Sequence, residues 1–307
     1  MTASGLPHQT IPARGLQVPF EGDCKLKPWE YEVTAAIPTI DSAERLHLVV
    51  SLLRLQTVRP FIVIVDTGSK PEQARALEAM RAEDVEVHQM RLNGVEHSSE
   101  PIAMAMDWIM ARCPTRFLFC THDDCFLRAR DALERFRDLA AVHAAAGHQL
   151  TKRPHDDWSR MVGHTALMLD NDRLLDLGVT WNMRRSMRTF GIERARREEQ
   201  YGNWPDTEVG LNYMLWDNGI RPFITGEEKN FARNCDDLID HCRSTGSSAL
   251  YSQGYSKIAQ NRLQDAVVDA KHRVNEWSRT RVAQAERLPP VPVTSKRERP
   301  GFTPGNL

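Results

Sequence analysis

The sequence has no long hydrophobic run and no excess of charge of either sign. Its purely apolar stretches are short, such as Phe61 to Val65, whereas a membrane-spanning helix needs about 20 residues. Lys and Arg number 40 against 41 Asp and Glu, which leaves a net charge of −1. A molecule with this balance is no general binder of polyanions. These absences argue against a membrane-spanning protein and against a nucleic-acid binder that relies on overall charge.

Cysteine is scarce, and its spacing suggests neither disulfides nor a metal site. The chain has six Cys and no C-x-x-C pair, and the first twenty residues contain no apolar signal core. We therefore expect reduced thiols and a cytoplasmic location. A zinc site built from Cys235, His241 and Cys242 would have a spacing that matches no common zinc pattern.

The chain also lacks internal repeats and a Gly/Ser linker, which predicts one continuous domain between two extensions. Residues 1–30 carry scattered Pro and Gly and are expected to form an N-terminal arm. The domain itself is expected over residues 31–250. Residues 251–307 are expected to form a C-terminal helix followed by a Pro-rich tail.

Strands and helices alternate in the first half of the domain. Short apolar runs predict buried strands, at Val33–Ile37, Phe61–Val65, Val85–Met90 and Arg116–Cys120. Helical spacing predicts helices at Ala43–Leu55, with Asp41 or Ser42 as N-cap, at Pro71–Ala82 and at Ile102–Ala111. This alternation is typical of an α/β protein with a nucleotide-binding sheet.

The second half has a less regular pattern. The expected strands are Met161–Leu169 and Arg221–Thr225, and the expected helices are Asp172–Leu177, Asp206–Trp216 and Tyr255–Arg287. An Arg-rich stretch, residues 184–197, could bind an anionic acceptor, although such runs are more often solvated helices with mixed charge.

Carboxylates follow three of the predicted strands. Asp41, Asp66 and Asp123 each come a few residues after a strand. Ligands of parallel sheets bind outside the carboxyl ends of the strands. We therefore expect these three side chains to line one crevice.

Four segments together resemble the family 2 glycosyltransferases of the GT-A fold. These are Val33–Thr39 (the opening strand), Leu52–Thr57 (the Leu-x-x-Gln-Thr segment), Ile64–Ser69 (the Val-Asp-Asp-Gly-Ser turn) and Phe117–Asp124 (the D-x-D motif). The resemblance covers about residues 31–250. It implies a GT-A, Rossmann-like fold: a mixed, mostly parallel sheet flanked by helices, with N- and C-terminal extensions. A nucleotide-binding half would span residues 31–125, and an acceptor half residues 126–250.

The family's activity is transfer of a sugar from a nucleotide-sugar to an acceptor hydroxyl. Breaking the bond to a diphosphate requires that its charge be neutralised, and a divalent ion does this as a Lewis acid. The resemblance implies that Asp123 and Asp124 hold Mn²⁺ or Mg²⁺, which prefer oxygen ligands. Thr121 stands where the motif has its first Asp. The alternative for this segment is a solvated acidic loop.

Further site residues come from the same resemblance. His241 would be the third metal ligand, although a lone His is more often structural. Asp66 would accept a hydrogen bond from the uracil N–H, which implies a UDP-sugar donor; the alternative is an ordinary turn residue before Gly68. The expected nucleotide-binding set is Pro38, Thr39, Asp41, Asp66, Asp123 and Arg243.

A second acidic pair lies in the acceptor half. Trp204–Leu211 resembles the family's Glu-Asp-x-Glu/Asp-Leu segment. Asp206 would be the base that deprotonates the acceptor in an inverting reaction, with Glu208 as the second candidate. Residues i and i+2 face different sides of a helix, so only one can reach a given atom. The alternative is an ordinary helix start, with Asp as N-cap and Glu in the first turn.

Two other functions stay open at this point. A sugar-phosphate nucleotidyltransferase would normally have a Gly-rich phosphate loop after its first strand, and residues 38–41 are not one. A non-catalytic, nucleotide-binding descendant of the fold is the other, and Thr121 favours it. The acceptor could be a saccharide, a lipid, a protein or a modified nucleic acid.

Overall fold

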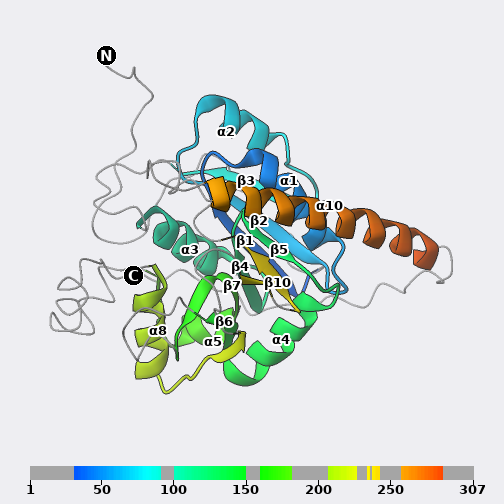
Figure 1. The fold of residues 1–307 in the computed structure, drawn as a ribbon. Helices are drawn as coiled ribbons and strands as arrows, with labels where there is room; N and C mark the ends of the chain where they lie inside the picture. The colour runs from blue at the N-terminus through cyan, green and yellow to red at the C-terminus, as the bar shows by residue number, and fades with distance from the viewer. Residues whose placement is uncertain are drawn as a thin grey trace, which may run out of the picture.

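The computed structural model describes residues 31–90, 100–149, 160–181, 207–226, 234–235, 237–242 and 257–285 (Figure 1). The predicted arm over residues 1–30 and the Pro-rich tail lie outside these ranges. In chain order the elements are β1 (Val33–Thr39), α1 (Ala43–Arg54), β2 (Pro60–Asp66), α2 (Pro71–Glu78), β3 (Val85–Gln89), α3 (Glu100–Arg112), β4 (Phe117–Thr121), β5 (Cys125–Leu127), α4 (Ala132–His143), β6 (Ala145–Gln149), β7 (Val162–Asp170), α5 (Asn171–Asp176), α8 (Thr207–Asp217), β8 (Phe223–Gly226), β9 (Asn234–Cys235), β10 (Ile239–His241) and α10 (Lys257–Ala285).

A seven-stranded sheet forms the centre of the molecule, in the order β3-β2-β1-β4-β7-β6-β8. β3, β2, β1 and β4 are mutually parallel, β7 runs antiparallel to both β4 and β6, and β6 is parallel to β8. The predicted α/β fold with a mixed, mostly parallel sheet is confirmed. A second, antiparallel sheet has the order β5-β10-β9.

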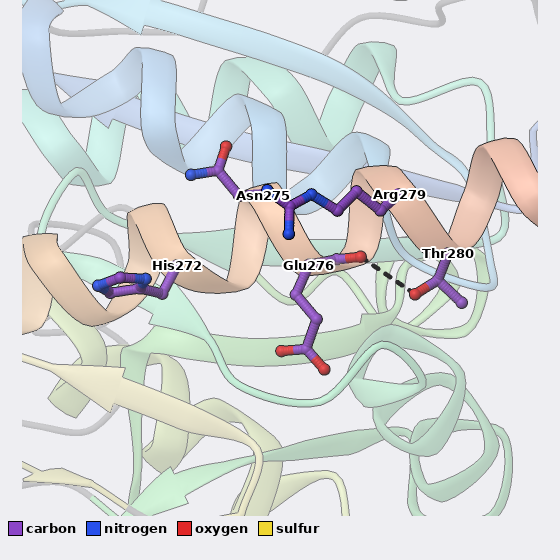
Figure 2. Close-up of a pocket in the computed structure, with 5 residues that line it drawn as sticks. All are labelled: His272, Asn275, Glu276, Arg279 and Thr280. Atoms are coloured by element: carbon purple, nitrogen blue, oxygen red, sulfur yellow. Dashed lines mark hydrogen bonds between the residues drawn. The ribbon is translucent and has the colours of Figure 1, made fainter.

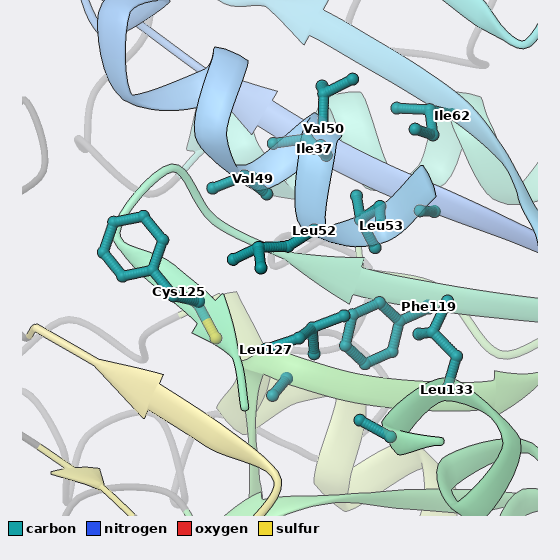
Figure 3. Packing of buried hydrophobic residues seen from close by; sticks show 14 of the residues in the cluster. Ile37, Val49, Val50, Leu52, Leu53, Ile62, Phe119, Cys125, Leu127 and Leu133 are labelled. Atoms are coloured by element: carbon teal, nitrogen blue, oxygen red, sulfur yellow. The ribbon is translucent and has the colours of Figure 1, made fainter. Parts of the chain in front are cut away.

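Helices cover both faces of the large sheet because its central strands are buried on both sides. Successive side chains of a strand point to opposite faces. In β1, Val33, Ala35 and Ile37 pack with residues of α1, α2, α4 and α10, whereas Ala36 packs with residues of α3, α5 and α8. Figure 3 shows the first of these clusters, in which Ile37 meets the α1 side chains.

The predicted elements are present with small shifts of their ends, and one helix is clearly shorter than predicted. α2 ends at Glu78 and not at Ala82. Ala82 instead forms a β-bridge with Val85, which opens β3. Ser42 occupies the predicted N-cap position of α1, but its hydroxyl makes no cap bond and pairs with the hydroxyl of Thr39.

The helix α4 and the strand β6 were not predicted from the sequence. Ala144, in the left-handed region at φ 65°, ends α4 and leads directly into β6 without a Gly or Pro as a signal. Gly147 lies inside β6, where a Cβ would come within 2.9 Å of the backbone oxygen of Ala166 in β7. Its role is therefore close strand packing and not a turn.

The C-terminal helix α10 packs on the core beside α1 (Figure 1). Ala266, Ala270 and Trp277 are buried in the same cluster as the α1 side chains. The domain boundary at residue 250 stays a prediction. Within the described ranges no helix combines the length and the hydropathy that a membrane crossing requires, and Cys113, Cys120, Cys125 and Cys242 are free thiols.

Candidate functional site

The carboxyl ends of β2, β1 and β4 lie side by side at one edge of the sheet. Thr39 at the end of β1 is in register with Asp66 at the end of β2, and Ala36 of β1 is in register with Cys120 of β4. The loops after these strands are therefore neighbours. This is the edge at which the sequence places the candidate residues.

The loops that follow β1 and β2 are bonded to one another. The Asp41 N–H donates to the Ser69 hydroxyl oxygen at 2.7 Å, and the Lys70 N–H donates to Asp41 Oδ1 at 2.8 Å. The Thr67 N–H donates to the Thr39 carbonyl at 2.9 Å. Asp41 has a φ of 53°, a conformation that Asp tolerates better than most residues. Asp41 thus holds the two loops together.

Asp66 is buried and fixes the turn that follows β2. Its Oδ1 accepts hydrogen bonds from the Gly68 N–H at 3.2 Å and the Ser69 N–H at 2.8 Å. This is the turn role that the sequence left open as the alternative. No described residue hydrogen-bonds to the other oxygen, Oδ2. One carboxylate oxygen can therefore support the turn while the second accepts from a ligand.

The segment after β4, which we call the 122–124 loop, carries two buried carboxylates, Asp123 and Asp124. Arg45, in the first turn of α1, donates through Nε to Asp123 Oδ2 at 3.0 Å, and its Nη2 contacts the same oxygen. Burial by itself lowers the pKa of Arg45, but the charge and hydrogen bonds of Asp123 and the charge of Asp124 raise that pKa overall. Arg45 is therefore a permanent positive charge beside the loop.

The small sheet brings His241 to the same loop. His241 in β10 pairs with Cys125 in β5, and the Cys242 N–H donates to the Asp124 carbonyl at 3.0 Å. His241 Nε2 lies 3.6 Å from Asp124 Oδ1. Two of the three predicted metal ligands are thus brought together by backbone pairing.

The acceptor half contributes a buried imidazole–carboxylate pair. His164 Nδ1 in β7 lies 2.6 Å from Glu208 Oε2 in α8. The side chain of Asn212 ties the two elements: its amide donates to the carbonyls of Val162 and Glu208 at 2.8 Å and accepts from the Val162 N–H at 3.0 Å. This bonding fixes the first turn of α8 against the start of β7.

His122 joins the two halves of the site. Its ring lies edge-on to that of His164, with the ring centroids 4.2 Å apart. Burial, and after it the nearby His164 and His241, lower the pKa of His122 well below its ordinary value. Its Nε2 is buried without a hydrogen-bond partner among the described residues. His122 is therefore a half-buried ring between the two halves of the site.

The sequence analysis did not single out His164 or Arg45. A signal for His164 existed, since it is an ionisable residue inside the mostly apolar run of β7. Arg45 offered none, because its partner lies 78 residues away in the chain. The predicted residues Asp206 and Arg243 and the stretch 184–197 lie outside the described residues.

The described side chains, as arranged, do not fit the predicted three-ligand metal site. Within the described ranges no group of three His, Cys, Asp or Glu side chains is placed to hold one ion. Asp124 and His241 face one another, but the carboxylate of Asp123 is engaged by Arg45. The side chain of Cys235 lies outside the described ones, so a zinc site at Cys235, His241 and Cys242 is not tested.

A hollow on the outer side of α10 is unrelated to this site. It is lined by His272, Asn275, Glu276, Arg279 and Thr280, which Figure 2 shows along one stretch of the helix. The Thr280 hydroxyl donates to the Glu276 carbonyl at 3.0 Å. The hollow contains none of the predicted site residues, so the sheet edge is the candidate site.

The chain matches no known protein-family model and no curated protein sequence, but solved structures resemble it. The glycosyltransferase GlyE of Streptococcus pneumoniae TIGR4 has a TM-score of 0.51 at 11% identity, over 82% of this chain and 64% of its own. The mannosyltransferase PcManGT of Pyrobaculum calidifontis, in complex with GDP-Man and Mn²⁺, has a TM-score of 0.45 at 14% identity, over 87% and 80%. TarS of S. aureus, in complex with UDP-GlcNAc, has a TM-score of 0.38 at 14% identity, over 48% of each chain.

These likenesses concern the fold. The protein has the GT-A fold, which the sequence resemblance predicted. It is structurally similar to glycosyltransferases. The chain spans 64% of GlyE and about half of TarS.

Proposed function

We propose that this protein is a glycosyltransferase that moves a sugar from a nucleotide-sugar donor to an acceptor hydroxyl. The observation that carries the proposal is the position of the 122–124 loop in a GT-A fold. Arg45 contacts this loop from the nucleotide half, and His164 and His241 reach it from the acceptor half. A donor bound at the sheet edge would therefore have its diphosphate beside the groups that receive the acceptor.

A uridine nucleotide is the donor that the described residues support best. Asp66 Oδ2 lies at the carboxyl edge with no described partner, while Oδ1 supports the turn. A carboxylate oxygen accepts from the imide N–H of uracil and has no proton to donate. Pro38 and Thr39 would contact the nucleoside, and the bonded loops after β1 and β2 would hold its pocket in shape.

The reaction we propose is an inverting displacement. The acceptor oxygen forms a bond to the anomeric carbon while the bond from that carbon to the diphosphate oxygen breaks. The electron pair of the broken bond stays on the diphosphate, and the acceptor proton passes to a carboxylate. Asp206 is our candidate for that base, and Glu208, which is buried against His164, is the second candidate.

Metal dependence stays a prediction of the sequence resemblance. Asp124 and His241 are the described residues that could contribute ligands to Mn²⁺ or Mg²⁺, which would supply Lewis-acid neutralisation of the leaving group. The binding experiment below measures this dependence directly.

The proposal is tested by calorimetric titration with UDP, with and without Mn²⁺, and by a donor-hydrolysis screen over nucleotide-sugars. We expect UDP binding and slow hydrolysis of at least one donor. Asp206→Asn should keep donor binding and lose transfer. Binding without any hydrolysis or transfer would favour the non-catalytic alternative, and release of pyrophosphate from a nucleoside triphosphate plus a sugar phosphate would favour a nucleotidyltransferase.

A further inference from the structure

Arg45 contacts Asp123 in the 122–124 loop, beside which the proposed function places the diphosphate. It lies in the first turn of α1, three residues after the N-cap Ser42, at the edge where the strand ends gather. Its side chain is 21% exposed, and the Asp123 side chain that it contacts is 11% exposed. The pair is therefore largely buried, but part of the Arg45 side chain remains accessible to a ligand.

The guanidinium of Arg45 uses only one of its edges on the protein. Nε and Nη2 both contact Asp123 Oδ2, and Nη1 makes no hydrogen bond or ion pair with any residue in the described ranges. A guanidinium carries five N–H donors in a rigid planar fork, whose shape matches a phosphate as well as a carboxylate. One edge can thus remain on Asp123 while the other binds a phosphate oxygen.

The loop presents fewer carboxylate ligands to a cation than the motif that it resembles. Thr121, which is buried, replaces the first acidic residue of the motif. Asp123 is engaged by the guanidinium of Arg45.

We propose that Arg45 binds the diphosphate of the donor directly, with Asp123 as its anchor, and supplies the charge that a divalent ion supplies in the family that the sequence resembles. This inference rests on the proposed function and deepens it. When the bond between the anomeric carbon and the diphosphate oxygen breaks, the electron pair remains on that oxygen. The adjacent guanidinium stabilises this added negative charge without any further reactant.

The first test is titration of the full chain with UDP, and separately with inorganic pyrophosphate, in EDTA. Wild type should bind both. Arg45→Met keeps the length of the side chain but removes its charge, and it should weaken UDP binding about 10- to 100-fold, as expected for loss of a charge-assisted, two-bond contact. Arg45→Lys should recover part of the loss, because it restores the charge without the fork.

Arg54→Met is the matched control. Arg54 lies on the same helix and also pairs with a buried aspartate, Asp84, through two bonds of 2.7 and 2.6 Å. It lies at the opposite end of α1, away from the strand ends that form the site. This variant should lose stability and keep the UDP affinity of wild type, which separates a binding role of Arg45 from a general effect of breaking an ion pair.

Two results would overturn the inference: a UDP affinity of Arg45→Met equal to that of wild type in EDTA, or UDP binding that disappears in EDTA and returns with Mn²⁺. The proposed function fails in a different way, if wild type binds no nucleoside diphosphate under either condition. In that case the pyrophosphate titration still decides the inference: binding by wild type that Arg45→Met loses supports an anion site at Arg45, and no binding by wild type rejects it.

Discussion

Asp66 has a structural role that leaves one of its oxygens for the proposed binding role. Its Oδ1 is committed to the turn that closes β2, and its Oδ2 is not engaged by any described residue. The two possibilities that the sequence left open, a turn residue and a base-reading residue, are therefore compatible in one carboxylate.

The variant Asp66→Asn separates the two roles. Asn keeps the oxygen that accepts from the Gly68 and Ser69 N–H groups, but places an amide donor where Oδ2 was. We expect UDP affinity to fall about tenfold or more, because the new donor meets the imide N–H of uracil. CDP binding should weaken less or improve, since the corresponding cytosine nitrogen is an acceptor. Equal losses for UDP and CDP, measured by titration with an unchanged melting temperature, would mean that Asp66 does not read the base.

The two acidic residues of the acceptor half should differ in their effect on catalysis. Glu208 is buried against His164, so it is placed to hold the imidazole more than to touch an acceptor. We expect Asp206→Asn to lower the kcat of transfer about 100-fold or more, and Glu208→Gln to lower it by less than about tenfold. Donor affinity should be unchanged in both variants. The reverse order of the two kcat values would assign the base role to Glu208.

At the level of elements, the ion pair of Arg54 and Asp84 fixes the C-terminal end of α1 to the start of β3. Burial raises the pKa of Asp84, but the hydrogen bonds and charge of Arg54 outweigh it and lower that pKa below its ordinary value of 3.8. The folded protein therefore holds fewer protons on this group than the unfolded chain. The stabilisation is complete above pH 3.8 and is lost as the pH falls through the pKa of the folded state.

This gives a pH prediction for Arg54→Met. At pH 7 the free energy of unfolding should fall by about 1–2 kcal/mol, a modest value because Arg54 is partly exposed. The difference from wild type should shrink as the pH falls below 4, since the pair no longer contributes once Asp84 is protonated. Urea unfolding at several pH values between 7 and 3 measures it. A difference that stays constant over this range would show that the loss comes from packing and not from the charge.

The sequence predicted those elements whose period is regular and whose ends carry a signal. The strands β1, β2 and β4 are short, mostly apolar runs followed by polar residues, so both they and the carboxylates after them could be located. β5, β9 and β10 have three residues or fewer, too short for any periodicity to show. They form through pairing between distant segments, and the approach of His241 to Asp124 depends on that pairing.

For the candidate site too, the sequence predicted what depends on a single strand and missed what depends on pairing between distant segments. Residues placed by one strand, such as Asp66 and Asp123, lie at the ends of the strands after which the sequence predicted them. Contacts between halves of the chain were not, because the ring pair of His122 and His164 and the ion pair of Arg45 with Asp123 depend on how β7 and α1 pack against β4.

At the scale of the whole molecule, α10 packs against α1 and β5, and its buried side chains belong to the same hydrophobic cluster. Trp277 is 7% exposed, whereas Val268 on the same helix is 51% exposed. Trp277→Ala should lower the free energy of unfolding by about 3 kcal/mol, and Val268→Ala should change it by no more than about 0.5 kcal/mol. Urea unfolding of both variants tests this. Similar small effects would show that α10 is an appendage, and the predicted boundary at residue 250 would then also be a boundary of stability.

An ion pair holds each end of α1: Arg45 with Asp123 at the N-terminal end, and Arg54 with Asp84 at the C-terminal end. Its twelve residues give α1 a length of about 18 Å. The helix therefore connects opposite edges of the sheet. Because the two ion pairs lie at opposite ends of the helix, loss of the Arg45 contact would leave the other end bonded to Asp84.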